Sequence, residues 1–332
     1  MKKSLGLLPF LFALLCLNGY AEAASAGEEM LKAVVKVRAV ISRDAESAGT
    51  LGTEREGNGV VIDGEGTILT ISYLIRDAEK IEVLGPDDEP VAAKFIGYDA
   101  NTGLGLLRTE PPLAVVPLKL GKSSALEAGD PILVAGFGGV EEVQAARVAM
   151  RREFAGYWEY LIEEAIFTVP AYANFGGAAL INSEGQLVGI GSLFTQLSIP
   201  GLGVLPCNMF VPTDLLPPVL ADLKKAGRSL KAPRPWLGIN AEEAHGRVFI
   251  TKVTSGGPAE KAGLKPGDMI LMVSGQEVGS LADLYRKIWG VGNAGVQVPL
   301  TVLTGAKLQE IKVPSQDRYK NPKTKPRKDI SL

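Results

Sequence analysis

The sequence predicts a mainly β protein built from antiparallel barrels or sandwiches, and three observations lead to this prediction. Short apolar runs rich in β-branched residues recur along the chain, and glycine-containing turns separate them. Helical periodicity is rare, and no helices alternate with the strands as they do in parallel sheets. The 332 residues are 46% hydrophobic, which is enough for two or three domains that each bury a core.

The predicted strands begin with residues 33–41, AVVKVRAVI, where apolar and charged side chains alternate as in a half-buried strand. Residues 57–70, GNGVVIDGEGTILT, then give a strand, a four-residue turn and a second strand, which indicates a β-hairpin. Further strands are predicted at residues 81–85, 92–98, 104–110, 130–137, 164–171, 177–193 and 207–212.

A helix is predicted near residues 213–227, at the end of the series of strands. Thr213 is expected to cap it, Lys224 and Lys225 to lie in its last turn, and Gly227 to stop it.

Composition divides the chain into five parts. Residues 1–26 read as a leader, and residues 27–227 hold the strand-rich body. Residues 228–233 are polar and carry a proline, which indicates a linker, and a second domain is predicted over residues 234–315. The basic, proline-broken residues 316–332 cannot bury a core and are predicted to be a disordered tail.

The leader has the features of a secretory signal peptide. Lys2 and Lys3 precede an apolar stretch, and small residues typical of a cleavage site follow it. The stretch is shorter than a membrane span, so no stable span is expected after cleavage; an uncleaved anchor helix is the alternative. A lipid anchor at Cys16 is disfavoured because Leu15 is larger than the residue such signals place there.

The net charge and the small number of cysteines and histidines exclude several classes of protein. The formal charge of −2 predicts no nucleic-acid partner. After cleavage Cys207 is the one remaining cysteine, which excludes an internal disulfide. The single histidine, His245, is interpreted as a solvated turn residue of the second domain. One cysteine and one histidine offer no ligand cluster, so neither a metal nor another cofactor is expected.

Three segments make the chain resemble the HtrA/Deg group, which are secreted trypsin-like serine proteases with a C-terminal PDZ domain. Residues 57–70 are similar to the strands that lead to the catalytic histidine, and residues 181–193 to the strand pair after the catalytic serine. Residues 257–284 hold a Pro-Ala-x-x-Ala-Gly-Leu-x-x-Gly-Asp pattern that few folds other than PDZ use. The resemblance covers about residues 30–315 and implies a trypsin-like double antiparallel β-barrel followed by a PDZ domain.

All three catalytic positions of that family are substituted in this chain. Tyr73, in TILTISYLI, stands where the relatives have the histidine. Gly103, in NTGLGLL, takes the place of the aspartate, and Phe175, in ANFGGA, that of the serine. The asparagine and the glycine pair around Phe175 still specify a tight turn. The resemblance therefore implies a retained nucleophile loop and a lost reaction, which is a pseudoprotease.

The chemistry of hydrolysis supports this interpretation. The reaction needs a hydroxyl nucleophile, an imidazole base and a carboxylate that orients it. Phe175 has no nucleophilic atom, the phenol of Tyr73 with a pKa of about 10 is a poor base, and Gly103 has no side chain. An oxyanion pocket without the triad gives only about 10³–10⁴ over water. A dyad of a lysine with Ser72 or Ser183 stays open as an alternative.

The segment RPWLGINAE, at the start of the second domain, resembles the family's carboxylate-binding loop. In such a loop consecutive backbone amides form a nest for the C-terminal carboxylate of a peptide. The resemblance gives that role to Leu237, Gly238 and Ile239, with Trp236 at the mouth.

The resemblance also places the bound peptide along the edge of the strand that follows this loop. Its apolar terminal side chain would enter a pocket lined by a helix over residues 280–288, on which three side chains share one face at helical spacing. These are Leu281, Leu284 and Ile288. The alternative is that all three are only core residues.

Three functions from different classes follow. The first is a secreted, inactive protease homologue that binds peptide C-termini or unfolded proteins as a scaffold, adaptor or holdase. The second is a serine endopeptidase of protein quality control with a non-standard nucleophile. The third is a regulatory subunit that co-assembles with an active relative. A homo-oligomer is the other assembly left open. The leader predicts export across the inner membrane to the periplasm.

Overall fold

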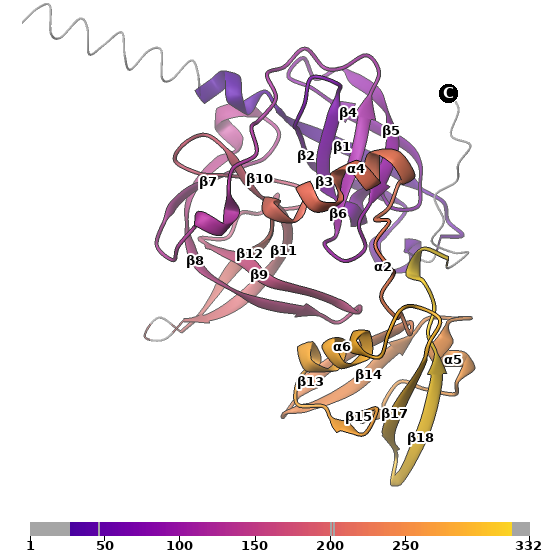
Figure 1. The fold of residues 1–332 in the computed structure, drawn as a ribbon. Helices are drawn as coiled ribbons and strands as arrows, with labels where there is room; N and C mark the ends of the chain where they lie inside the picture. Colours follow the sequence, from indigo (N-terminus) through magenta and orange to yellow (C-terminus); the bar gives the residue numbers. More distant parts are fainter. Residues whose placement is uncertain (1–26, 46, 200, 202, 321–332) are drawn as a thin grey trace, which may run out of the picture.

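The structure is a computed structural model in which two β-barrels and a smaller sheet domain follow one another (Figure 1). The mainly β class predicted from the sequence is confirmed. The predicted leader, residues 1–26, lies outside the described residues, as do residues 321–332 of the predicted tail. The described residues are 27–45, 47–199, 201 and 203–320.

The first barrel closes six antiparallel strands in the order β1-β2-β3-β6-β5-β4. The predicted hairpin at residues 57–70 is present, with Val60 opposite Leu69. The inward side chains form one fully buried apolar cluster that includes Val37 and Leu106. The strands are β1 (Val34–Ile41), β2 (Glu54–Val61), β3 (Thr67–Ile71), β4 (Ala78–Leu84), β5 (Pro90–Tyr98) and β6 (Leu104–Thr109).

The second barrel closes in the order β10-β11-β12-β9-β8-β7. Its longest strand, β8, was missed by the sequence prediction, because its register shifts between Val148 and Met150 and again between Arg152 and Phe154. Such bulges break the alternation that identifies a strand. The strands are β7 (Pro131–Ala135), β8 (Val143–Gly156), β9 (Tyr160–Val169), β10 (Ala179–Ile181), β11 (Leu187–Ile199) and β12 (Gly203–Pro212).

The C-terminal domain is a sheet in the order β13-β14-β15-β17-β18, with β16 paired to β15. Strand β13 lies at one edge. Helix α6 begins after Ser280, whose hydroxyl accepts a hydrogen bond from the Asp283 N–H at 3.1 Å. The elements are β13 (Ile239–Ala244), β14 (Arg247–Val253), α5 (Pro258–Lys261), β15 (Met269–Val273), β16 (Gln276–Glu277), α6 (Leu281–Gly290), β17 (Gln297–Thr304) and β18 (Lys307–Pro314).

Short helices occupy the connections between the strands. Within the described residues no helix is both long and apolar enough to cross a bilayer. The short elements are α2 (Ala48–Leu51), α3 (Ser72–Ile75), η1 (Ser123–Ala125), η2 (Gly139–Glu142), η3 (Thr213–Leu215), α4 (Pro217–Ala226) and η4 (Arg318–Lys320).

The helix predicted at residues 213–227 starts later than expected. Thr213 does not cap α4; it lies in the separate turn η3, and its hydroxyl donates to the carbonyl of Leu187 at 3.2 Å. Helix α4 begins at Pro217, because prolines fit the first turn of a helix, where the N–H groups have no partner. The predicted stop at Gly227, with φ 72°, is confirmed.

The prediction of a disordered tail is wrong for its first residues, since residues 316–320 have defined contacts. Gln316 exchanges two backbone hydrogen bonds of 3.0 Å with Trp236. Asp317 pairs with Arg228 at 2.9 Å, and the Tyr319 ring lies 5.3 Å from that of Tyr98 in the first barrel. The high proline and lysine content after residue 320 concealed this short anchoring segment.

Asp63 ties the turn between β2 and β3 to helix α4. Lys224 Nζ donates to its carboxylate at 2.8 Å, and the N–H groups of Glu65 and Thr67 donate at 2.9 and 3.0 Å. Burial by itself would raise the pKa of Asp63, but these donors outweigh it and lower the pKa to about 2.

We expect Asp63→Asn to lower the free energy of unfolding by about 1–2 kcal/mol near pH 7. The folded pKa lies below the unfolded value of 3.8, so the carboxylate stabilises the fold above pH 4 and loses this effect as the pH falls towards 2. Urea unfolding at pH 7 and pH 3 checks this. Asp44→Asn, at an exposed site, is the control; an equal loss for Asp63→Asn at both pH values would contradict the assignment.

Candidate functional site

The three substituted catalytic positions come together in one cleft. Its volume is about 1010 Å³, and Tyr73, Gly103 and Phe175 all line it. They come from separate parts of the chain: helix α3 after β3, the turn before β6, and the loop before β10. The three positions assigned from the sequence therefore lie together in the structure.

The loop that displays Phe175 is held by Asn58 of β2. The Asn58 Nδ2 donates to the carbonyl of Asn174 at 2.7 Å, and its backbone N–H donates to the carbonyl of Gly176 at 2.7 Å. Gly177 has a φ of 75°, and a Cβ there would overlap the carbonyl oxygen of Asn58. The loop conformation is thus fixed by the backbone, while the Phe175 ring lies half-buried, 6.4 Å from the Phe194 ring.

Tyr73 acts as a hydrogen-bond donor in this cleft. Its hydroxyl donates to the carbonyl of Ser192 at 2.9 Å. Burial raises the pKa of Tyr73 above the ordinary value of a phenol. A phenol that keeps its proton and has already directed it to a carbonyl cannot accept the proton of a nucleophile.

Tyr160, which the sequence prediction missed, fills the space next to Gly103. The Tyr160 hydroxyl donates to the carbonyl of Thr102 at 2.6 Å. A Cβ on Gly103 would lie 3.3 Å from that hydroxyl and 3.5 Å from Ile71 Cδ1. The position also has a φ of 77°, which L side chains rarely adopt. Tyr160 would crowd a side chain at this position and the backbone conformation would strain it, so both disfavour an orienting carboxylate here.

The alternative catalytic groups do not come together in one site. His245 is exposed at the turn between β13 and β14 and does not line the cleft. Ser72 does line the cleft, whereas Ser183 lines a different pocket at the turn between β10 and β11. In the part of the chain that the structure describes, no lysine Nζ donates to a serine hydroxyl, and no three His, Cys, Asp or Glu residues form a metal-binding group.

The loop at the start of the C-terminal domain directs three consecutive amides at one carboxylate. The N–H of Leu237 donates to Glu159 Oε2 at 2.9 Å. The N–H groups of Gly238 and Ile239 donate to Glu159 Oε1 at 2.7 and 3.0 Å. The amides thus form a carboxylate nest, and its occupant is a side chain of the second barrel.

Glu159 was not singled out in the sequence. It lies in the turn between β8 and β9, and the missed strand β8 concealed that turn. Its side chain is buried, at 4% exposed. Burial raises the pKa of Glu159, while the neighbouring Arg318 guanidinium and the three amides of the loop act against the rise. Three amide donors and the guanidinium of Arg318 therefore favour the ionised form of this carboxylate.

The predicted side chains of helix α6 lie in the core of the C-terminal domain. Leu281, Leu284 and Ile288 are at most 8% exposed and share one apolar cluster with Leu237 and Ile239. The structure therefore brings the helix face and the loop together. Leu284 is completely buried, so a charged residue there would disrupt the core and could not serve as a selective test of binding.

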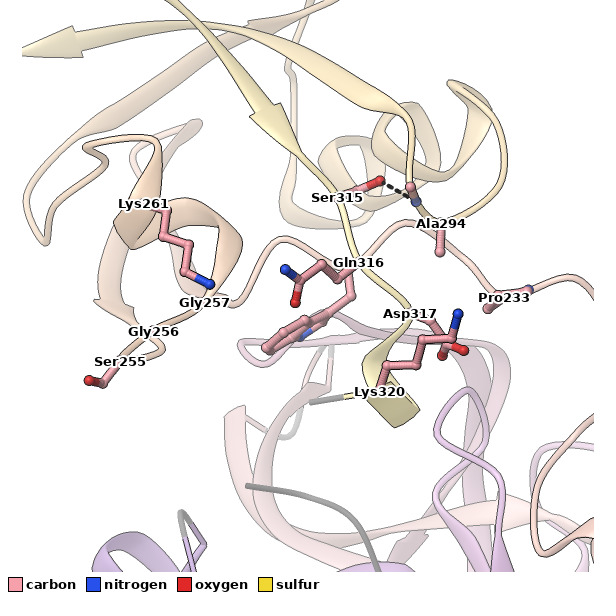
Figure 2. A pocket seen from close by; sticks show the side chains of 12 residues that line it. Pro233, Ser255, Gly256, Gly257, Lys261, Ala294, Ser315, Gln316, Asp317 and Lys320 are labelled. Carbon is pink, nitrogen blue, oxygen red and sulfur yellow. Dashed lines mark hydrogen bonds between the residues drawn. The ribbon is translucent and has the colours of Figure 1, made fainter. Parts of the chain in front are cut away.

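Trp236 lies between the carboxylate loop and a pocket of about 550 Å³. A Cβ on Gly238 would be 3.2 Å from the Trp236 ring, so the ring packs against the loop. Figure 2 shows Lys261 and Lys320 on opposite sides of this pocket, with Gln316 between them and Asp317 beside Lys320. The Ser315 hydroxyl accepts a hydrogen bond from the N–H of Gly295 at 3.1 Å and closes one wall.

Comparison with known proteins agrees with this architecture. Residues 57–190 match the trypsin-like peptidase domain family, and residues 235–314 match the PDZ domain family. A probable periplasmic serine endoprotease, DegP-like, from Pseudomonas putida (strain GB-1) is 30% identical over 274 residues, covering 77% of this chain and 55% of the relative. The chain thus spans about half the length of the first curated relatives that it matches.

Two further similarities cover more of the chain. A serine protease Do-like HtrA from Lactobacillus helveticus is 27% identical over 329 residues, covering 90% of this chain and 77% of the relative. The solved structure of the HtrA-type protease AlgW with decapeptide has a TM-score of 0.54 and 23% identity, covering 90% of this chain and 98% of that one; at this identity it shows the fold alone. The chain, with a trypsin-like peptidase domain followed by a PDZ domain, belongs to the HtrA/DegP family.

Proposed function

We propose that this chain is a catalytically inactive HtrA-like protein whose PDZ domain binds peptide C-termini or unfolded chains, in a scaffold, adaptor or holdase role. One observation carries the proposal. Tyr73, Gly103 and Phe175 line the same cleft, and none of them supplies a nucleophile, a base or an orienting carboxylate. The peptide-binding residues of this proposal are Trp236, Leu237, Gly238, Ile239, Leu281, Leu284 and Ile288.

A serine endopeptidase with a non-standard nucleophile is the second candidate, because the curated relatives are named serine endoproteases. Ser72 and Ser192 line the cleft. The Ser192 carbonyl is the acceptor of Tyr73, and Ser72 lies in helix α3 with its N–H donating to the carbonyl of Gly103. Neither serine hydroxyl has a base in hydrogen-bond contact within the described residues, which argues for the inactive assignment.

A periplasmic location and assembly with related chains belong to the same proposal. The relatives from Pseudomonas putida and Haemophilus influenzae are named periplasmic, and the leader predicted from the sequence would direct export. A role as a regulatory subunit of an active relative would use the same PDZ domain and requires no catalysis by this chain.

We expect the purified mature chain and its Phe175→Ser variant both to leave unfolded fluorogenic casein uncleaved and to resist labelling by a fluorophosphonate probe. The members of a triad act as a unit, so a serine without base and orienter recovers little activity. The DegP-like relative from Pseudomonas putida, assayed in parallel, shows that the assay works. Labelling of the wild-type chain that one serine substitution abolishes would establish the endopeptidase instead, and turnover by Phe175→Ser alone would show that the triad positions are wrongly assigned.

A further inference from the structure

The carboxylate nest of the PDZ domain is occupied in the folded chain itself. Both carboxylate oxygens of Glu159 accept hydrogen bonds, and all three donors are backbone N–H groups of the loop, at 2.7–3.0 Å. A peptide C-terminus would present the same planar carboxyl group to the same donors. Glu159 therefore stands where the terminal carboxylate of a ligand would be held.

The segment that carries Glu159 also contacts the edge of the sheet as a bound strand would. The N–H of Ala241 donates to the carbonyl of Tyr157 at 2.8 Å. Ala241 lies two residues after Ile239, so both donors point from the same edge of β13, and the other edge pairs with β14. Carboxylate capture and main-chain pairing at the strand edge together constitute β-strand addition.

An apolar side chain of the same hairpin enters the core of the PDZ domain. Leu161, the second residue of β9, is only 6% exposed and belongs to the same buried cluster as Leu284 and Ile288 of helix α6. Among the described residues it is the one buried member of that cluster that comes from the barrels, and Ala155 of β8 packs against the same cluster. The hairpin thus supplies a carboxylate, a main-chain acceptor and an apolar side chain.

Further contacts lock the hairpin in place. The Tyr285 hydroxyl of α6 donates to the carbonyl of Gly156 at 2.8 Å and accepts from the N–H of Glu159 at 3.2 Å. Arg318 of η4 donates to the carbonyls of Trp158 and Glu159 at 2.6 and 3.2 Å. In Figure 1 the hairpin between β8 and β9 reaches from the second barrel to α6.

The backbone of Glu159 is strained in this position. Its φ is 54°, in the left-handed region that side chains other than glycine adopt at a cost. A buried carboxylate adds a desolvation cost that only its donors offset. A glycine or asparagine would fit the backbone conformation of this turn better. The contacts of the side chain with the carboxylate loop explain why a glutamate occupies the position instead.

We propose that Glu159 is an internal ligand of the PDZ carboxylate loop, so that the β8–β9 hairpin and the C-terminal carboxylate of a partner peptide compete for one site. This inference rests on the proposed peptide-binding function of the domain. A partner must displace the hairpin, and its apparent affinity is reduced by the fraction of chains that are closed. The ligand class is an extended peptide with a free carboxylate and an apolar last side chain.

The competition is tested on the full mature chain with two measurements. The first is hydrogen exchange of the amides of Leu237, Gly238 and Ile239 without any peptide, in the wild type and in Glu159→Ala. The second is fluorescence anisotropy with fluorescein-labelled Gly-Ser peptides ending in Val, Leu or Phe, each with a free and an amidated C-terminus. Glu184→Ala, at an exposed turn of the second barrel, is the matched control.

We expect Glu159→Ala to expose the three amides, raising their exchange by about tenfold or more, and to bind at least one free-carboxylate peptide about tenfold more tightly than the wild type does. The amidated peptides are expected to gain nothing, and Glu184→Ala to behave as the wild type. In the wild type, a saturating free-carboxylate peptide is expected to increase exchange across residues 156–161.

The outcomes separate the two proposals. Unchanged exchange at the three amides, or equal affinity of wild type and Glu159→Ala for the free-carboxylate peptides, overturns the internal ligand. Faster exchange in Glu159→Ala with no peptide bound by either protein supports the internal ligand and refutes peptide capture. Should Glu159→Ala fail to fold by circular dichroism, Glu159→Gln keeps the shape and removes the charge, and the same exchange and affinity comparisons decide the matter.

Discussion

Gly177→Ala is expected to prevent stable folding of the pair of barrels, with a loss of about 4–5 kcal/mol or more. A Cβ at this position would overlap the carbonyl oxygen of Asn58 and approach Thr70 Oγ1 to 2.8 Å, and the φ of 75° is unfavourable for alanine. Asn58 cannot move away, because it is buried and its side chain also accepts from the N–H of Phe137 at 2.9 Å. It joins β2 to two loops of the second barrel.

Thermal unfolding followed by circular dichroism measures this effect. Gly64→Ala is the control, since the turn there has open space around the missing Cβ and no positive φ. A melting temperature of Gly177→Ala within a few degrees of the wild type would show that the loop can shift, and that its shape is less constrained than Asn58 suggests.

Arg318→Ala is expected to release the β8–β9 hairpin from the PDZ domain, with a loss of about 3–5 kcal/mol from that contact. The substitution removes the donor of two carbonyls, those of Trp158 and Glu159. It also removes the positive charge that acts on the buried Glu159 carboxylate. A buried carboxylate that loses a neighbouring cation destabilises the arrangement around it more than the lost hydrogen bonds alone.

Limited proteolysis at the hairpin and hydrogen exchange of residues 156–161 report the release. Lys320→Ala is the control, because Lys320 lies in the same turn, η4, and is exposed. Unchanged proteolysis of Arg318→Ala would mean that the amides of the loop and Tyr285 hold the hairpin without the guanidinium.

Local patterns in the sequence carry much of the fold. The alternation in residues 33–41 and the hairpin in residues 57–70 depend on neighbouring residues only, and both are found in the structure. The helix that the family resemblance implies at residues 280–288 is also found, as α6. Strand β8 does not follow from local patterns, because two bulges shift its inward side, and bulges depend on the partner strand rather than on the strand's own composition.

The candidate site, like the fold, could be predicted from the sequence only where local motifs determine it. The substitutions at positions 73, 103 and 175 are read directly from family motifs, and the structure places them in one cleft. The role of Glu159 depends on a contact between residues almost 80 positions apart. Nothing in the local pattern YWEY indicates a partner. Tyr160 was missed for the same reason: its place beside Gly103 arises only when the two barrels pack.

The carboxylate that fills the loop and the loop itself are parts of one chain, so their association does not depend on protein concentration. A tethered ligand acts at an effective concentration that reaches about the millimolar range when the connection is short. Diluting the protein therefore leaves the loop filled, whereas a free peptide loses occupancy in proportion to its own dilution. We expect the PDZ domain to bind peptide C-termini where they are locally concentrated, as on an aggregate or an assembled partner. The same C-terminal sequence at low concentration is expected to stay unbound.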